Sequence, residues 1–104
     1  MDSNLLLINA NALSILSAPE VMRDRSGQPK VFGPKADIWS LGVILYYMTY
    51  GAIPGYHPRA ANPPNGQPPT RDPLLRDLLM RTLVLDPNRR IDMQGLMMHP
   101  YTNR

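Results

Sequence analysis

The feature that most constrains this chain is an uncharged, largely apolar run from Ile38 to Tyr50. Apolar side chains recur along it at spacings of three and four residues, which predicts a helix. A membrane span needs roughly 20 apolar residues, and this run is shorter. It therefore predicts a helix buried on all sides within a domain, with Leu41 and Leu45 deep in the core. Two sets of side chains would cover its surface: Ile38, Leu41, Leu45 and Met48 on one face, and Trp39, Val43, Tyr46 and Tyr50 beside and behind it.

Residues at both ends of this run give the central helix clear limits. Gly33 can cap its start, Pro34 suits the first helical position, and Asp37 in the first turn favours the helix dipole. Gly51 suits the left-handed residue that follows a last turn, and Pro54 prevents any continuation. The sequence thus predicts one helix between Gly33 and Gly51.

A second helix is predicted over Asp72–Asp86. Asp72 can cap its start and Pro73 suits its first position, while Pro87 prevents continuation. Its apolar stripe would face the core and consists of Leu75, Leu78, Leu79 and Leu83.

A third, shorter helix is predicted over Ile91–Tyr101. Asp92 is its expected cap, and Leu96 and Met97 are expected to face inward. Gly95 inside this helix costs about 1 kcal/mol against alanine.

Proline interrupts the chain between the first two of these helices. Six prolines lie in residues 52–71, at positions 54, 58, 63, 64, 68 and 69. No helix persists through that spacing, so the stretch predicts an irregular loop. It holds no P-x-x-P, the pattern that ligands of SH3-type domains carry.

The stretches on either side of residues 17–20 are less decisive. Leu5–Ile8 suits a short buried strand and Ala10–Leu16 suits a helix, but short apolar runs do not decide between the two. Val21–Gly33 is polar and rich in turn-forming residues, which predicts a surface loop.

Composition excludes several classes of function. The net charge of +3 is spread along the chain without a basic cluster, so no nucleic-acid binding is predicted. Cysteine is absent, and His57 and His99 have no partner at metal-ligand spacing, so no metal site is predicted. Met1–Ser17 does not have the pattern of a secretory signal. These features predict an intracellular protein with no membrane partner.

Four short motifs occur in an order typical of one protein family. Asp37–Gly42 (DIWSLG) resembles the D-x-W-S-x-G signature of the central helix in protein-kinase C-lobes. Ala18–Glu20 (APE) resembles the end of a kinase activation segment. Leu85–Ile91 (LDPNRRI) and His99–Tyr101 (HPY) resemble the approach to the last C-lobe helix and its end. Ile44–Gly51 (ILYYMTYG) is further similar to the monopolar-spindle checkpoint kinases, dual-specificity enzymes that act at kinetochores.

This resemblance implies a mainly α-helical fold that is part of a protein-kinase C-lobe. The central buried helix, two C-terminal helices and a long proline-rich loop would compose it. Residues 1–17 would be an atypical N-terminal segment. Residues 18–101 would be the partial kinase domain, with the loop of residues 52–71 inside it.

The residues that the resemblance singles out have structural roles. Glu20 would pair with Arg90 and pin the end of the activation segment to the lobe, the alternative being a solvated surface glutamate. Asp37 resembles an aspartate that braces the catalytic loop, although without that loop it would only stabilise the first helical turn. The full set of structural motif residues is Ala18, Pro19, Glu20, Asp37, Trp39, Gly42 and Arg90.

The groups that phosphoryl transfer needs are absent from these 104 residues. There is no G-x-G-x-x-G, H-R-D or D-F-G, and no lysine placed to contact ATP. We therefore predict no catalytic, cofactor-binding or metal-binding residue in this chain, although the parent family uses ATP and magnesium.

The function predicted is that of a non-catalytic, pseudokinase-like fragment of an ATP-dependent serine/threonine kinase, dual-specificity in type and acting in the spindle checkpoint. Its expected partner is the remainder of a kinase domain, the parent family's substrates are proteins, and its expected location is the nucleus or kinetochore. The alternative is a small kinase-derived interaction module with no enzymatic role.

Overall fold

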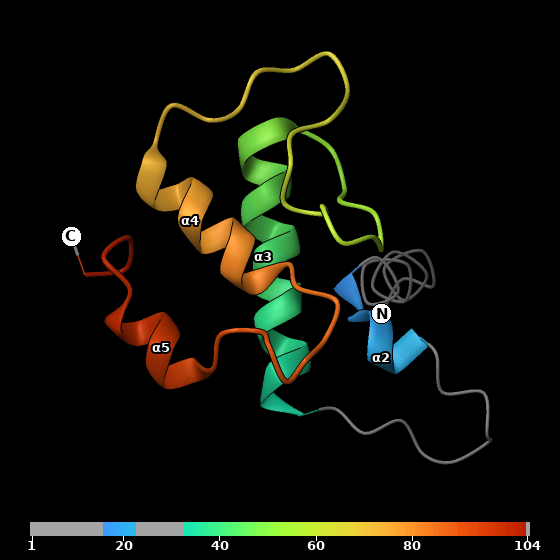
Figure 1. The fold of residues 1–104 in the computed structure, drawn as a ribbon, viewed down its shortest axis with the longest axis vertical. Coiled ribbons are helices and arrows are strands. Elements are labelled where there is room, and N and C mark those ends of the chain that lie inside the picture. Colours follow the sequence, from blue (N-terminus) through green and yellow to red (C-terminus); the bar gives the residue numbers. More distant parts are fainter. Residues whose placement is uncertain (1–15, 23–32, 104) are drawn as a thin grey trace, which may run out of the picture.

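A computed structural model describes residues 16–22 and 33–103 of the 104-residue chain. Its regular structure over those ranges is entirely helical, and no helix there is long and apolar enough to cross a membrane. The predictions for Leu5–Ile8, for most of Ala10–Leu16 and for residues 23–32 lie outside the described residues. Four helices lie within the described ranges: α2 (Pro19–Met22), α3 (Pro34–Tyr50), α4 (Pro73–Thr82) and α5 (Met93–Met98) (Figure 1).

Helix α3 has the limits that its flanking residues predict. Gly33 caps it in an extended conformation, and Pro34 occupies the first turn. Gly51 adopts the left-handed conformation at φ 71°, and its N–H donates to the Tyr47 carbonyl at 2.7 Å. This position favours glycine because a Cβ strains a backbone with that φ.

Helix α4 begins as predicted and ends four residues earlier than predicted. The Asp72 carboxylate accepts hydrogen bonds from the N–H groups of Leu74 and Leu75, at 3.1 and 3.2 Å. At Leu83 the backbone leaves the helical conformation, with φ −92° and ψ 55°, and its side chain is buried. The following residues turn back, so that Ile91 N–H donates to the Arg81 carbonyl at 3.0 Å.

Helix α5 is shorter than the predicted Ile91–Tyr101. Asp92 caps it by accepting from Gly95 N–H at 2.7 Å, and Leu96 is buried. The prediction that Met97 faces inward is wrong, because its side chain is 67% exposed. A helix of six residues buries one narrow face, and Leu96 alone occupies it here.

The core lies between α3 and the two C-terminal helices. One cluster centres on Trp39 and Val43 of α3 and Leu79 of α4, and a second joins Ile38, Leu78 and Leu96. Gly42 lies at a close contact between α3 and the end of α4: a Cβ there would be 2.5 Å from the Thr82 hydroxyl oxygen and 2.9 Å from Leu83.

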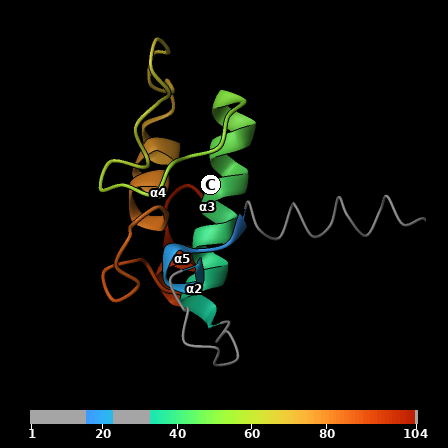
Figure 2. The ribbon, with the colours of Figure 1, turned by 90° about the vertical axis from the view of Figure 1, so that its right-hand side faces the viewer.

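The prediction that α3 is buried on all sides is wrong within this chain. Ile44, Tyr47 and Met48 are 43%, 56% and 77% exposed, and Leu41 and Leu45 are only half-buried. Figure 2 shows the reason, because α4 and α5 lie on the same side of α3. The α3 side chains in the larger core cluster are instead those of the second predicted set: Trp39, Val43, Tyr46 and Tyr50.

Residues 51–72 form neither helix nor strand, yet their path is held by hydrogen bonds to α3. Tyr46 donates its hydroxyl to the Asn62 carbonyl at 2.8 Å. Gln67 donates to the Tyr50 carbonyl, and Thr70 N–H donates to the Tyr50 hydroxyl, both at 3.2 Å. Ala60 is buried against the same helix. We call residues 51–72 the proline-rich loop.

Candidate functional site

The predicted ion pair between Glu20 and Arg90 is present and bidentate. The two guanidinium nitrogens of Arg90 lie 2.8 and 3.0 Å from the two carboxylate oxygens of Glu20. Glu20 lies in the first turn of α2, and Arg90 lies in the turn before α5. Paired, parallel hydrogen bonds of this kind fix orientation as well as charge. The structure thus confirms the pairing and not the alternative of a fully solvated glutamate.

Every N–H of the Arg90 side chain has an acceptor. Besides Glu20, the guanidinium donates to the carbonyls of Val84 at 2.9 Å, Lys35 at 2.7 Å and Leu85 at 3.3 Å. Guanidinium carries five N–H donors, and five hydrogen bonds are made. Because the residue is only 2% exposed, this complete pairing offsets the cost of removing the charge from water.

Lys35 belongs to the same cluster and is hydrogen-bonded to Arg90 through both its side chain and its backbone carbonyl. Its ammonium group donates to the carbonyl of Arg90 at 2.5 Å and to that of Pro87 at 3.1 Å, while its own carbonyl accepts from Arg90. The sequence analysis missed this role, since a lysine in the first turn of a helix gives no sign of where its long side chain ends. We call Glu20, Lys35 and Arg90 the clamp.

Two aromatic residues pack beside the clamp. Trp39 is fully buried, and its ring centre lies 5.2 Å from the guanidinium carbon of Arg90, a cation–π distance. The Tyr56 ring lies 5.7 Å from that of Trp39, and its hydroxyl donates to the Ser17 carbonyl at 2.5 Å. Ser40 donates to the Leu16 carbonyl at 2.6 Å. Leu16 is therefore hydrogen-bonded to α3, and Ser17 to the proline-rich loop.

Charge and burial shift two pKa values in this cluster. Burial on its own raises the pKa of Glu20, but the hydrogen bonds and charge of Arg90 outweigh it, so that the net pKa is lowered. Burial, and then the negative charge of Glu20, raise the pKa of the Tyr56 phenol. Glu20 is thus held ionised and Tyr56 neutral near pH 7, the forms that their hydrogen bonds require.

The remaining predicted motif residues have clear positions. Ala18 and Pro19 are buried beside the clamp, and Gly42 permits the close approach of α4. Asp37 is exposed in the first turn of α3, and no side-chain partner for it occurs in residues 16–22 or 33–103. Its carboxylate is placed to favour the helix dipole, and the bracing role remains a prediction.

A second buried polar group was not predicted. His99 is 5% exposed, its Nδ1 accepts the Tyr101 N–H at 3.0 Å, and its Nε2 lies 2.7 Å from the Asp77 carboxylate. Neutral histidine with Nδ1 as acceptor carries its proton on Nε2, which then donates to Asp77. Hydrogen bonds from His99 and Arg81 lower the pKa of Asp77. This group fastens the end of α5 to α4.

The chemistry of these residues is that of anchoring. Each charged side chain in the clamp makes at least two hydrogen bonds to protein partners. Within the described part of the chain, no three histidine or carboxylate side chains gather where they could hold a metal ion.

Comparison with known proteins gives this arrangement a context. The profile of the family described as "Protein kinase domain" matches residues 14–102. "Dual specificity protein kinase TTK" of Mus musculus is 40% identical over 101 residues, which cover 81% of this chain and 12% of that protein. "Testis-specific serine/threonine-protein kinase 1" of Homo sapiens is 55% identical over 38 residues, or 36% of this chain and 9% of that protein. "Sperm motility kinase 1" of Mus musculus is 53% identical over 38 residues, and the matched part is 7% of its length. The chain thus spans about an eighth or less of the length of these relatives.

Proposed function

This chain belongs to the protein kinase family, as a mainly α-helical part of the C-lobe, and on that premise we propose that it anchors the end of an activation segment without catalysing phosphoryl transfer itself. The observation that carries the proposal is the clamp. A bidentate Glu20–Arg90 pair, sealed by Lys35 and Trp39, joins α2 to the turn before α5 across 70 residues of sequence.

The parent protein, on this proposal, is an ATP-dependent serine/threonine kinase of the dual-specificity type. The similarity to a dual specificity kinase over 81% of the chain supports this class. We propose a role in the spindle checkpoint, with protein substrates and a nuclear or kinetochore location. This finer assignment rests on the resemblance of Ile44–Gly51 to the monopolar-spindle checkpoint kinases.

The non-catalytic character of these 104 residues follows from the groups that phosphoryl transfer requires. ATP and magnesium supply the phosphoryl group and neutralise its charge, and kinases hold them with a glycine-rich loop, a lysine, and metal-binding Asp and Asn residues. The sequence contains none of these motifs, and its two lysines are Lys30 and Lys35. Lys35 is committed to two backbone carbonyls.

The expected partner is the remainder of a kinase domain. The outer side of α3 exposes Ile44, Tyr47 and Met48, and apolar surface of this size favours being covered. In the proposed parent the other parts of the domain cover it. The alternative, a kinase-derived interaction module, would use the same side of α3 to dock on an unrelated protein.

The experiment that tests the proposal compares the chain with a chimera. The purified 104-residue chain is assayed with labelled ATP, magnesium and a generic protein substrate. In the chimera, residues 14–102 replace the matching segment of the mouse dual specificity kinase. We expect no transfer above background from the chain and measurable transfer from the chimera, which an Arg90→Met substitution in the chimera lowers.

Two results would contradict the proposal in different ways. Transfer by the chain alone, lost in a Lys35→Ala, Asp37→Ala double variant, would show that these residues assemble a catalytic site. A chimera that is well folded but inactive, together with stable accumulation of the chain as a monomer, would favour the interaction module.

A further inference from the structure

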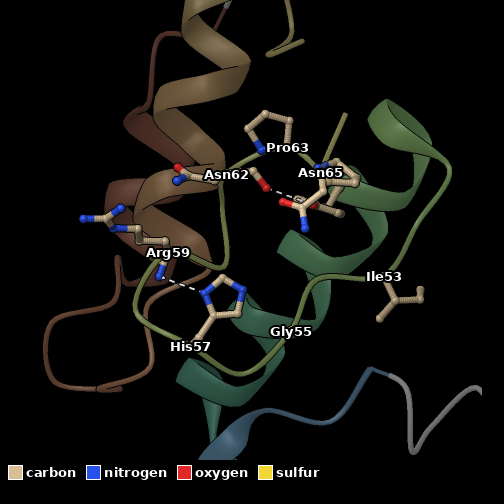
Figure 3. Close-up of a pocket in the computed structure, with 9 residues that line it drawn as sticks. Ile53, Gly55, His57, Arg59, Asn62, Pro63 and Asn65 are labelled. Atoms are coloured by element: carbon tan, nitrogen blue, oxygen red, sulfur yellow. Dashed lines mark hydrogen bonds between the residues drawn. The ribbon is translucent and has the colours of Figure 1, made fainter. Parts of the chain in front are cut away.

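A pocket lies between the proline-rich loop and the C-terminal half of α3, away from the clamp. It has a volume of about 420 Å³. In Figure 3 the ring of His57 and the side chain of Asn65 point toward the same space, while the guanidinium of Arg59 points outward. We propose that this pocket binds an oxyanion, a phosphate or carboxylate group carried by a peptide. Its lining consists of Tyr46, Ile53, Gly55, His57, Arg59, Asn62, Pro63, Pro64 and Asn65.

Two contacts fix the orientation of His57. Its Nδ1 accepts the backbone N–H of Arg59 at 3.2 Å, so the neutral ring carries its proton on Nε2. The ring also lies against Gly55, where a Cβ would be 2.9 Å from the Cδ2 atom of His57 and 3.4 Å from its Nε2. Glycine at position 55 therefore leaves the room that the ring occupies. The outcome is a hydrogen-bond donor, Nε2–H, held on the pocket side.

The charge around the pocket favours an anion. No aspartate or glutamate occurs between Asp37 and Asp72, so most of α3 and all of the proline-rich loop except its last residue lack negative charge. None of the lining residues is acidic, and Arg59 adds a positive charge at the rim. An oxyanion in the pocket would accept hydrogen bonds from Nε2–H of His57 and from the Asn65 amide without facing a carboxylate.

The loop that forms the pocket is held in place before any ligand binds. The Tyr46 hydroxyl donates to the Asn62 carbonyl at 2.8 Å. Two turns within the loop close through Ala60 N–H to the His57 carbonyl at 3.1 Å and Asn62 N–H to the Arg59 carbonyl at 3.0 Å. A preformed site loses less conformational freedom on binding. The apolar walls, Ile53, Pro63 and Pro64, suit the carbon atoms next to the bound group.

Titration followed by nuclear magnetic resonance tests this site on the full chain at constant ionic strength. The probes are inorganic phosphate, a phosphoserine peptide, and the same peptide with serine or glutamate at that position. We expect saturable shifts of the His57 and Asn65 side-chain signals with phosphate, the phosphoserine peptide and, more weakly, the glutamate peptide. The serine peptide and added chloride are expected to leave them unchanged.

Two substitutions of His57 distinguish the roles of its two ring nitrogens. His57→Asn keeps an acceptor for Arg59 N–H and loses the outer donor, whereas His57→Gln keeps a donor near the Nε2 position. We expect His57→Asn to weaken phosphate binding about tenfold, because a hydrogen bond to a charged group contributes about that factor. We expect His57→Gln to bind phosphate within about threefold of the parent, because it keeps the donor.

Circular dichroism establishes that both variants are folded. The proposal is overturned if phosphate gives no saturable shift, or if both variants bind as the parent does. It is also overturned if chloride shifts the same signals equally, since the pocket would then respond to ionic strength alone. The kinase assay above uses neither position 57 nor position 65, so failure of this proposal and failure of the proposed function are independent.

Discussion

The two sides of α3 differ in how completely their groups are satisfied. On the inner side Trp39 and Val43 are at most 2% exposed, and the clamp closes over the first turn. On the outer side Tyr47 and Met48 are 56% and 77% exposed. Both sides come from one uncharged, largely apolar run. The apolar sequence therefore predicts that the helix is buried, but the elements that pack against it determine which of its faces is buried.

The difference extends to polar groups. On the inner side, every N–H of the Arg90 side chain has a hydrogen-bond acceptor. One buried polar atom there is an exception, because the indole N–H of Trp39 has no hydrogen-bond partner in the described structure. Its ring instead lies at cation–π distance from Arg90. A buried charge must be paired almost completely to be tolerated, whereas an exposed apolar side chain costs little.

Removing the guanidinium is the strongest way to break the inner side. Arg90→Met leaves Glu20 without its partner and three carbonyls without a donor. We expect a loss of about 3–5 kcal/mol in the free energy of unfolding, measured by urea denaturation. Arg90→Lys keeps the charge without the planar fork and is expected to fall between the parent and Arg90→Met. A methionine variant as stable as the parent would show that the clamp does not anchor α2.

Adding a methyl group where α3 meets α4 tests the packing of the inner side. The Cβ of Gly42→Ala would lie 2.5 Å from the Thr82 hydroxyl oxygen, too close for the helices to keep their present distance. Overpacking of this kind typically costs about 1–3 kcal/mol, to be measured as a lower urea midpoint. An unchanged midpoint would mean that α3 and α4 are less closely packed than described.

Sequence reasoning located α3, α4, α5 and the clamp pair because all of them leave local signals, but it did not predict α2, whose residues Val21 and Met22 were expected to lie in a surface loop. Glycine, proline and aspartate at helix ends act within one turn, and the Glu20–Arg90 pair follows from two motifs in order. It failed for the faces of α3, for Met97 and for Lys35. Which face of a helix is covered depends on elements far away in sequence, and the direction of a long side chain depends on acceptors that only the fold brings near. The His99–Asp77 contact was missed for the same reason.

Acid is expected to weaken the contacts that Glu20 makes in the clamp and that Asp77 makes with His99 and Arg81. The pKa of Glu20 and that of Asp77 are lowered by folding from 4.5 and 3.8. A group with a depressed folded pKa contributes stability above its unfolded pKa and loses it as the pH falls through the folded pKa. We therefore expect the urea midpoint to be level above about pH 5 and to fall below about pH 4.

Substitution separates the two contributions to this acid dependence. Glu20→Gln is expected to reduce the part of the fall in urea midpoint that comes from the clamp. Asp77→Asn is expected to reduce the part that comes from the contact between α4 and the end of α5. A midpoint that rises on acidification, or a fall that neither variant reduces, would contradict the assignment of these carboxylates.

Polar substitution on the outer side is expected to have the smallest effect on stability. Met48→Gln and Tyr47→Gln remove apolar surface that is mostly in water, so the free energy of unfolding should change by less than about 0.5 kcal/mol. The same changes should reduce concentration-dependent association in sedimentation velocity. A loss above about 1 kcal/mol in a monomeric sample would show that this face is covered within the chain.

Hydroxyl-radical footprinting of the full chain at low concentration tests the two-sided account of α3 most directly, because one experiment reports on both sides. The account predicts rapid modification of Met48 and Tyr47, and strong protection of Trp39 and Tyr46, which are 0% and 3% exposed. Protection of Met48 as strong as that of Trp39 would contradict it, and so would modification of Trp39 at the rate seen in urea-unfolded chain.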